Sequence, residues 1–237
     1  MLLGVLAVPC LMMAEQVSDI MTDLERGISD GYCLDAVLSG LQSDAVLMAF
    51  PVICALPYAA SFTEDRKTGI YRSLLLRTSY RDYIWSKGLA CAISGGLVLV
   101  LGIALAALLS ALILGCLEPA AVTFEGESLR AGLRSLLRYM LLYFLSGALW
   151  SVFGMLTAML TGSMYLAYLA PFSGYYLLII FHERYFRHAD IIYPKLWLTV
   201  SEDAAPGYWT SVLWVSELLL LLLFIFRYSA ERKIADV

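Results

Sequence analysis

His182, Glu183 and His188 are the residues of this chain that come nearest to a catalytic motif. The zinc-protease motif H-E-x-x-H places two histidines at positions i and i+4, on one face of a helix. The two histidines here stand at i and i+6, so a helix would direct them to different faces. We therefore predict no metal site and no catalytic residue here, and expect interfacial polar side chains.

Glu217 is the single acid well inside an apolar run that extends over 208–226. A carboxylate at the centre of a bilayer costs about 3 kcal/mol on insertion scales, and usually faces a cavity or a partner. Glu217 therefore lies either on a translocation pathway or at a subunit interface. The alternative is an offset helix, from which the carboxylate reaches outward to water beside Ser216.

Motifs for nucleotide binding and acyl transfer are missing from the sequence. It contains no G-x-x-x-x-G-K-[ST] phosphate loop, so we expect no ATP or other cofactor bound by this chain. It also lacks the G-x-S-x-G nucleophile elbow. The sequence thus predicts a protein that is not itself an enzyme.

The composition is that of an integral membrane protein. Of the 237 residues, 61% are hydrophobic and 15% are charged, whereas soluble domains are about half apolar and a quarter charged. The formal net charge of -4 argues against a nucleic-acid partner, which would select a basic face. We expect one all-α polytopic transmembrane domain over 1–237, surrounded by lipid.

Six apolar segments predict six transmembrane helices, because each bilayer crossing needs about 20 residues. The predicted spans are about 1–14, 45–62, 88–117, 139–160, 165–181 and 208–226. The first is short, and we expect a transmembrane helix whose cytoplasmic end is missing or whose start codon is placed too late. Pro51 and Pro57 predict a bend in the second span, since proline removes a backbone donor.

Small residues predict close helix contacts. The uncharged run 139–181 is about twice the length of one span, so it must form a hairpin, with its turn near Thr161, Gly162 and Ser163. Gly154 and Ala158 offer a small surface to a neighbouring helix, in the same chain or in a second copy. Ser94, Gly95 and Gly96 predict either a close contact or a local break in the third span; they are the small residues near its start.

A polar segment at 57–87 interrupts the apolar runs and is rich in basic residues. Short loops with this bias stay in the cytoplasm, which predicts a cytoplasmic loop at 63–87 and cytoplasmic termini. Within the loop, Ile70 and Leu74 repeat at helical spacing, while Arg72 and Arg77 fall mostly elsewhere on the helix. Such a helix lies on the membrane surface or docks into a partner.

The order of residues in this loop resembles that of type-2 ABC transporter permeases. An apolar helix ending in PYAASF is followed by E-x-x-x-x-G, from Glu64 to Gly69, and then by the apolar and basic helix from Ile70 to Arg77. The stretch SKGLACAISGGLVLVLG is similar to a clostridial-type branch of these permeases. The sequence departs from the family at Thr78 and Ser79, where many members have proline.

The resemblance implies a type-2 ABC exporter-like fold with a cytoplasmic coupling helix between spans 2 and 3. A separate ABC ATPase subunit would hold ATP and Mg²⁺ and drive export of a hydrophobic or amphipathic cargo, such as a peptide, an antimicrobial compound or a lipid. The permease would form a homodimer or pair with a related permease in a bacterial cytoplasmic membrane, and part of the loop 182–207 would fold back toward the outer leaflet. The residues that would transmit ATPase motion are Glu64, Gly69, Ile70, Tyr71, Arg72, Leu74 and Arg77.

Two other classes of membrane protein stay open. A secondary carrier or channel that works without ATP would favour several intramembrane charges and an inverted repeat. Glu217 is the one such charge, and no repeat is visible in the sequence. An accessory membrane subunit is the other alternative.

Overall fold

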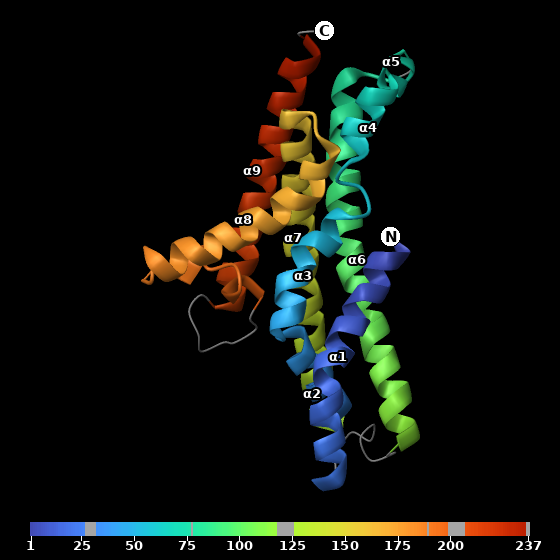
Figure 1. Ribbon diagram of the computed structural model, residues 1–237, viewed down its shortest axis with the longest axis vertical. Helices are drawn as coiled ribbons and strands as arrows, with labels where there is room; N and C mark the ends of the chain where they lie inside the picture. The colour runs from blue at the N-terminus through green and yellow to red at the C-terminus, as the bar shows by residue number, and fades with distance from the viewer. Residues whose placement is uncertain (27–31, 77, 118–125, 189, 199–206, 236–237) are drawn as a thin grey trace.

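The computed structural model describes residues 1–26, 32–76, 78–117, 126–188, 190–198 and 207–235 (Figure 1). Every regular element in these ranges is helical. The α-helices are α1 (Leu2–Arg26), α2 (Tyr32–Leu41), α3 (Asp44–Ala55), α4 (Ser61–Thr68), α5 (Ile70–Leu75), α6 (Tyr80–Leu117), α7 (Gly126–Thr161), α8 (Met164–Arg184) and α9 (Tyr208–Ala235). Two short 3₁₀ helices, η2 (Asp190–Ile192) and η3 (Leu196–Leu198), follow α8.

Four helices in the described ranges are long and apolar enough to cross a membrane: parts of α6, α7, α8 and α9. The bent pair Cys33–Leu41 and Asp44–Ala55 makes a fifth if it counts as one span. The apolar part of α1, Leu2–Ala14, is shorter than a full crossing. The helices therefore indicate a multi-pass membrane protein, and the count of six spans stays a prediction.

Helix α7 forms the centre of the bundle, and α3, α6, α8 and α9 pack around it (Figure 1). In its most apolar window 67% of the residues are buried, against 33% in α6 and 22% in α8 and α9. Aromatic rings fill the contact between α3, α7 and α8. The Tyr175 ring meets Phe50 at 5.3 Å and Trp150 at 5.7 Å, both edge to face.

Helix α6 packs closely against α7. A Cβ at Gly95 would lie 2.4 Å from the Cβ of Ser151 and 2.9 Å from the carbonyl oxygen of Gly147. Glycine is therefore required for the two backbones to approach this closely. Because α6 continues unbroken through Ser94, Gly95 and Gly96, these residues form a contact and not a break.

The predicted hairpin between the fourth and fifth spans is present. Helix α7 ends at Thr161, α8 begins at Met164, and Gly162 turns the chain with a φ of 72°. Gly154 lies against the carbonyl of Ala167, 2.3 Å from where a Cβ would stand, so its close neighbour is α8 of the same chain.

The helices begin and end at different residues from the apolar runs. Helix α3 ends at Ala55, before the predicted limit at 62, and its apolar partner is α2, to which it is bent by 67°. Helices α6 and α7 start earlier than expected, at Tyr80 and Gly126. Hydropathy marks only the apolar part of a helix, whereas the backbone hydrogen bonds continue through the polar turns.

The described residues after α8, 190–198, pack against the bundle. Trp197 and Leu198 in η3 are each 3% exposed and pack among α7 and α9. The Trp197 indole donates a hydrogen bond to the carbonyl of Ile191 at 2.7 Å. Lys195 Nζ donates to Asp44 Oδ1 at 2.8 Å, which ties this segment to the start of α3.

Candidate functional site

Helices α4 and α5 form a short helix-turn-helix at the end of the bundle where the C-terminal end of α9 also lies (Figure 1). Gly69 is the C-cap residue of α4 and the N-cap residue of α5, with φ 75° and ψ 2°. This left-handed conformation costs other residues about 1–2 kcal/mol, so glycine suits the turn. A Cβ at Gly69 would meet no atom within 4 Å, which means that conformation and not crowding selects glycine.

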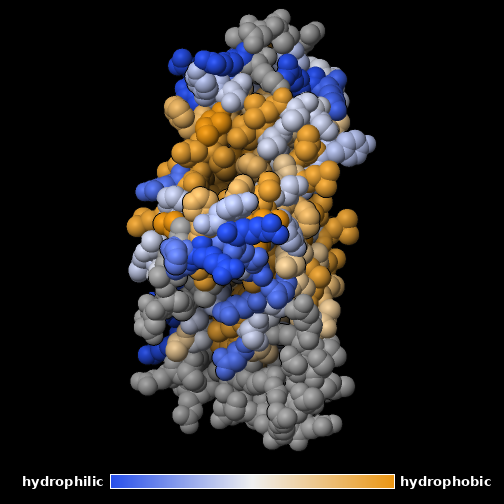
Figure 2. All heavy atoms as spheres, turned by 60° about the vertical axis from the view of Figure 1, so that its left-hand side comes forward, coloured by the Kyte–Doolittle hydropathy of each residue, from blue (hydrophilic) through white to orange (hydrophobic). Residues whose placement is uncertain are grey.

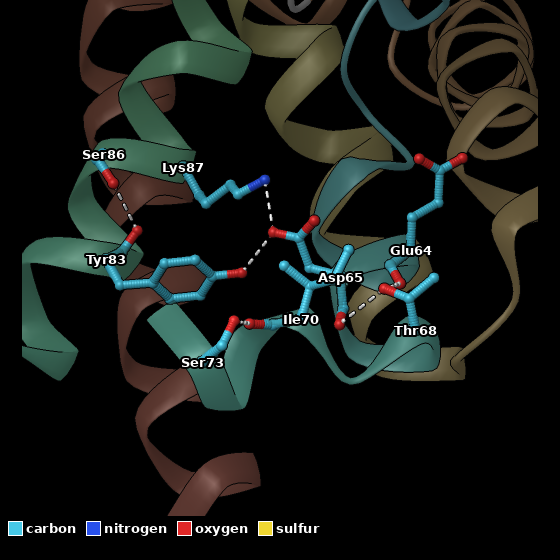
Figure 3. Close-up of polar contacts among 8 residues, drawn as sticks. All are labelled: Glu64, Asp65, Thr68, Ile70, Ser73, Tyr83, Ser86 and Lys87. Carbon is cyan, nitrogen blue, oxygen red and sulfur yellow. Dashed lines mark hydrogen bonds and ion pairs between the residues drawn. The ribbon is translucent and has the colours of Figure 1, made fainter. Parts of the chain in front are cut away.

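An ion pair between Asp65 and Lys87 fixes α4 to α6 (Figure 3). Lys87 Nζ lies 2.7 Å from Asp65 Oδ2, and the Tyr83 hydroxyl donates to the same oxygen at 2.8 Å. The two charged side chains are 14% and 18% exposed, so the pair is shielded from water and only weakly screened. Lys87 Nζ also lies 5.0 Å from the centre of the Tyr58 ring, a cation–π distance.

Apolar contacts hold the same part of α4 against α6 and α9. Phe62 is 3% exposed, and its ring meets Phe226 edge to face at 5.4 Å and Tyr83 at 6.3 Å. The Tyr80 hydroxyl donates to the carbonyl of Ala230 at 2.5 Å and so joins α6 to α9. Helices α4, α6 and α9 are thus packed together at this end.

The structure brings five of the seven predicted coupling residues together on α4, the turn and α5. Asp65 points toward α6, whereas Glu64 points away from it and is exposed (Figure 3). Ile70 is 51% exposed and Leu74 is 36% exposed, while Tyr71 is half-buried against the cluster around Phe62.

The other two predicted residues are only partly described. Arg72 belongs to α5, but its side chain is outside the described part of the structure, and Arg77 lies outside the described residues altogether. Leu76, which sequence reasoning missed, is 89% exposed immediately after α5. Its signal was the run of three leucines at 74–76, which is longer than one helix face can bury.

The residues that anchor the site, Asp65, Tyr83 and Lys87, were also missed as site residues. A weak signal existed, because Lys87 is the last charge before the long uncharged run 88–117. A lysine at such a boundary either extends to water or finds an acid. Nothing in the local sequence selects Asp65 over Glu64 as that acid, because the choice depends on which face of α4 meets α6.

Glu217 lies apart from this site, on the outward face of α9. It is exposed beside Leu213 and Leu220, which are 62% and 67% exposed, and no hydrogen bond or ion pair holds its carboxylate in the described structure. The His182 ring stacks on Tyr193 with centroids 4.5 Å apart. In the described residues no three His, Cys, Asp or Glu side chains gather closely enough to hold a metal ion.

No family model, curated protein or solved structure matches the chain. The site combines an α4 anchored to α6 and α9 with a projecting, partly apolar α5. Such an arrangement can bind a protein partner and pass a movement on to α6 and α9.

Proposed function

We propose that this chain is the membrane-spanning permease subunit of an ATP-driven ABC transporter that exports a hydrophobic or amphipathic cargo. A separate ATPase subunit supplies the energy and binds ATP and Mg²⁺. The observation that carries the proposal is the exposure of Ile70, Leu74 and Leu76 at a polar end of the bundle.

Apolar side chains in that position need a protein partner. Exposed Glu64 and Lys67 lie on the adjacent helix α4, and Arg232 lies near the end of α9, so this end meets water or lipid headgroups. Lipid chains cover exposed leucines in the spans but do not reach a charged end. A short helix with a few apolar anchors and a polar rim is the kind of surface that docks into a groove.

The anchoring of α4 suggests how movement would travel. A partner that pushes α5 moves α4 with it, because the Asp65–Lys87 pair and the Phe62 ring tie α4 to α6 and α9. Closure of two ATPase subunits would then shift the helices of a permease dimer between two packings. Export, the pairing of two permease chains and their bacterial cytoplasmic membrane are parts of the same proposal.

Replacement of Leu74 by aspartate tests the proposal. We expect the tagged protein to co-purify with an ATPase subunit from mild detergent, in a complex with two copies of each chain. Leu74→Asp should reduce ATPase recovery by about tenfold or more, since a buried, unpaired carboxylate disrupts an apolar contact.

Thr78→Asp is the matched control, because it adds the same charge at an exposed polar position beyond α5. It should retain the ATPase. Recovery of the unmodified chain without any ATPase would contradict the proposal. That result would favour a carrier, a channel or an accessory subunit, for which exposed Glu217 would be the first residue to examine.

A further inference from the structure

An apolar cavity of about 360 Å³ lies between α7, α8, α9 and η3, at a distance from the α4–α5 site. Its volume is within the usual range for ligand pockets, about 300–1,000 Å³. Leucine, phenylalanine, tryptophan and glycine form its whole wall. The side-chain polar atoms of this wall are the two indole nitrogens. That of Trp197 already donates to Ile191, and that of Trp150 is buried without a partner in the described structure. A cavity of this composition favours hydrocarbon.

The cavity opens sideways, toward the outer surface of the helices. Trp150 and Trp197 form its inner wall and are each 3% exposed. Leu177 on α8 and Leu221 on α9 form its edge and are 53% and 54% exposed. Helix α8, which carries Leu177, leaves the bundle at a large angle to α9 (Figure 1).

The surroundings of the opening identify the occupant. Both edge residues belong to candidate membrane spans, so the opening meets the hydrocarbon region and not water. Figure 2, which brings forward the side to which α8 extends, shows an apolar area between polar residues at the top and a hydrophilic patch at about mid-height. A hydrocarbon chain is thus the group that can enter from outside and fill the cavity.

Glu217 is not part of the cavity wall, but it places a carboxylate next to it on α9. It directly precedes Leu218 and stands one helical turn before Leu221, and both leucines line the cavity. A carboxylate at this depth needs a cation or a hydrogen-bond donor, and it has no such partner in the described structure. The chemistry that satisfies both features is a hydrocarbon chain carrying a positively charged group.

The geometry points to a binding site for a cationic amphiphile, with its chain in the cavity and its ammonium group at the Glu217 carboxylate. Binding at this site does not require an ATPase. Only its role as a cargo site rests on the proposed function, in which case the cargo class would be hydrophobic amines or amphipathic cationic peptides.

Tryptophan fluorescence measures this binding directly. Of the five tryptophans, Trp85, Trp209 and Trp214 are not part of the wall, and replacing them by phenylalanine leaves Trp150 and Trp197 as reporters. The protein is placed in phosphatidylcholine nanodiscs without any ATPase and titrated with dodecylammonium that carries bromine on its chain. We expect saturable quenching of the emission.

Two variants distinguish the contribution of the hydrocarbon chain to binding from that of the ammonium group. Leu218→Phe puts a larger side chain into the cavity, which excludes about two methylene groups of the dodecyl chain. It should therefore weaken dodecylammonium binding by about tenfold. Glu217→Gln should weaken it by about tenfold as well, but leave the brominated alcohol dodecanol bound as before. Leu169→Phe makes the same change at an exposed residue of α8, outside the cavity wall and on a different helix from Glu217, and should alter neither affinity.

The proposed site would be contradicted if quenching rose linearly with the probe concentration and did so equally in the reporter protein with Leu218 and in Leu218→Phe. Such quenching would report only partition of the probe into the bilayer. If Leu218→Phe does not insert, Leu177→Phe fills the same cavity from α8. If Glu217→Gln binds dodecylammonium as before but no longer cross-links as a dimer, the proposed contact between the ammonium group and the Glu217 carboxylate is wrong. Glu217 then belongs to a subunit interface. Neither result depends on whether an ATPase co-purifies.

Discussion

At the scale of single residues, the Asp65–Lys87 ion pair attaches α4 to α6. We predict that Lys87→Met destabilises the protein by about 2–3 kcal/mol, because it leaves the Asp65 carboxylate and its Tyr83 hydrogen bond without the counter-charge. Denaturation in a mild detergent, followed by loss of helix signal, measures this change. The double variant with Asp65→Asn should lose little more than the single one, since the two residues form one interaction.

Arg81→Met provides the matched control for this change. Arg81 is an exposed cation on the first turns of the same helix α6, and its loss should alter stability by less than about 0.5 kcal/mol. Equal effects of Arg81→Met and Lys87→Met would show that net charge, and not the buried pair, determines the result.

The residue scale is also where sequence reasoning reaches its limit. It placed Ile70 and Leu74 together on one short helix, since that depends on local spacing, and both residues are exposed on α5. It did not identify Asp65 as the partner of Lys87. The two residues meet only because Gly69 and the residues around Tyr58 turn α4 back against α6, and that turn is a tertiary outcome.

At the scale of elements, the contact of α6 with α7 has no room for an added atom at Gly95. We predict that Gly95→Ala destabilises the protein by about 2 kcal/mol or more, because the new methyl group would meet Ser151 and the carbonyl of Gly147. Gly88→Ala is the same substitution in the same helix, where the nearest atom is the mobile end of Leu223 at 3.2 Å. Thermal unfolding of both in one detergent compares them, and a larger loss in Gly88→Ala would contradict this account.

A break between helices can be predicted from the sequence when its cause is local, but not when distant residues stabilise it. The α7–α8 turn was predictable because Gly162 and its neighbours interrupt an apolar run of double length. The bend of the second span was expected at Pro51 and Pro57. Helix α3 runs through Pro51 and ends at Ala55, just before the turn that contains Pro57. A further break, which was not expected, comes earlier, at Gln42 and Ser43.

Distant residues stabilise that break. Ser43 accepts a hydrogen bond from the backbone N–H of Val46 and caps α3. The Tyr143 hydroxyl donates to the carbonyl of Leu41 at 2.5 Å, and the Gln42 amide donates to the Tyr139 hydroxyl. Both tyrosines belong to α7, so the groups that satisfy the broken backbone could not be found by local pattern.

At the scale of the whole molecule, the orientation in the membrane decides whether an ATPase can reach α5. The basic loop 63–87 predicts a cytoplasmic α5, and Figure 1 places α5 at the same end as the C-terminus of α9. The end of α8 with Tyr185 lies well away from that end, so labels that cannot cross the membrane should distinguish the two positions.

We predict that Leu76→Cys reacts with an impermeant maleimide only after the membrane is opened, whereas Tyr185→Cys reacts in intact cells. Both variants are made after replacing the five native cysteines, and both side chains are well exposed, at 89% and 71%. Leu220→Cys controls for exposure alone, because it is 67% exposed but lies inside a candidate span and should react in neither case. Labelling of Leu76→Cys in intact cells would place α5 outside the cell, where no ATP-driven subunit could bind it.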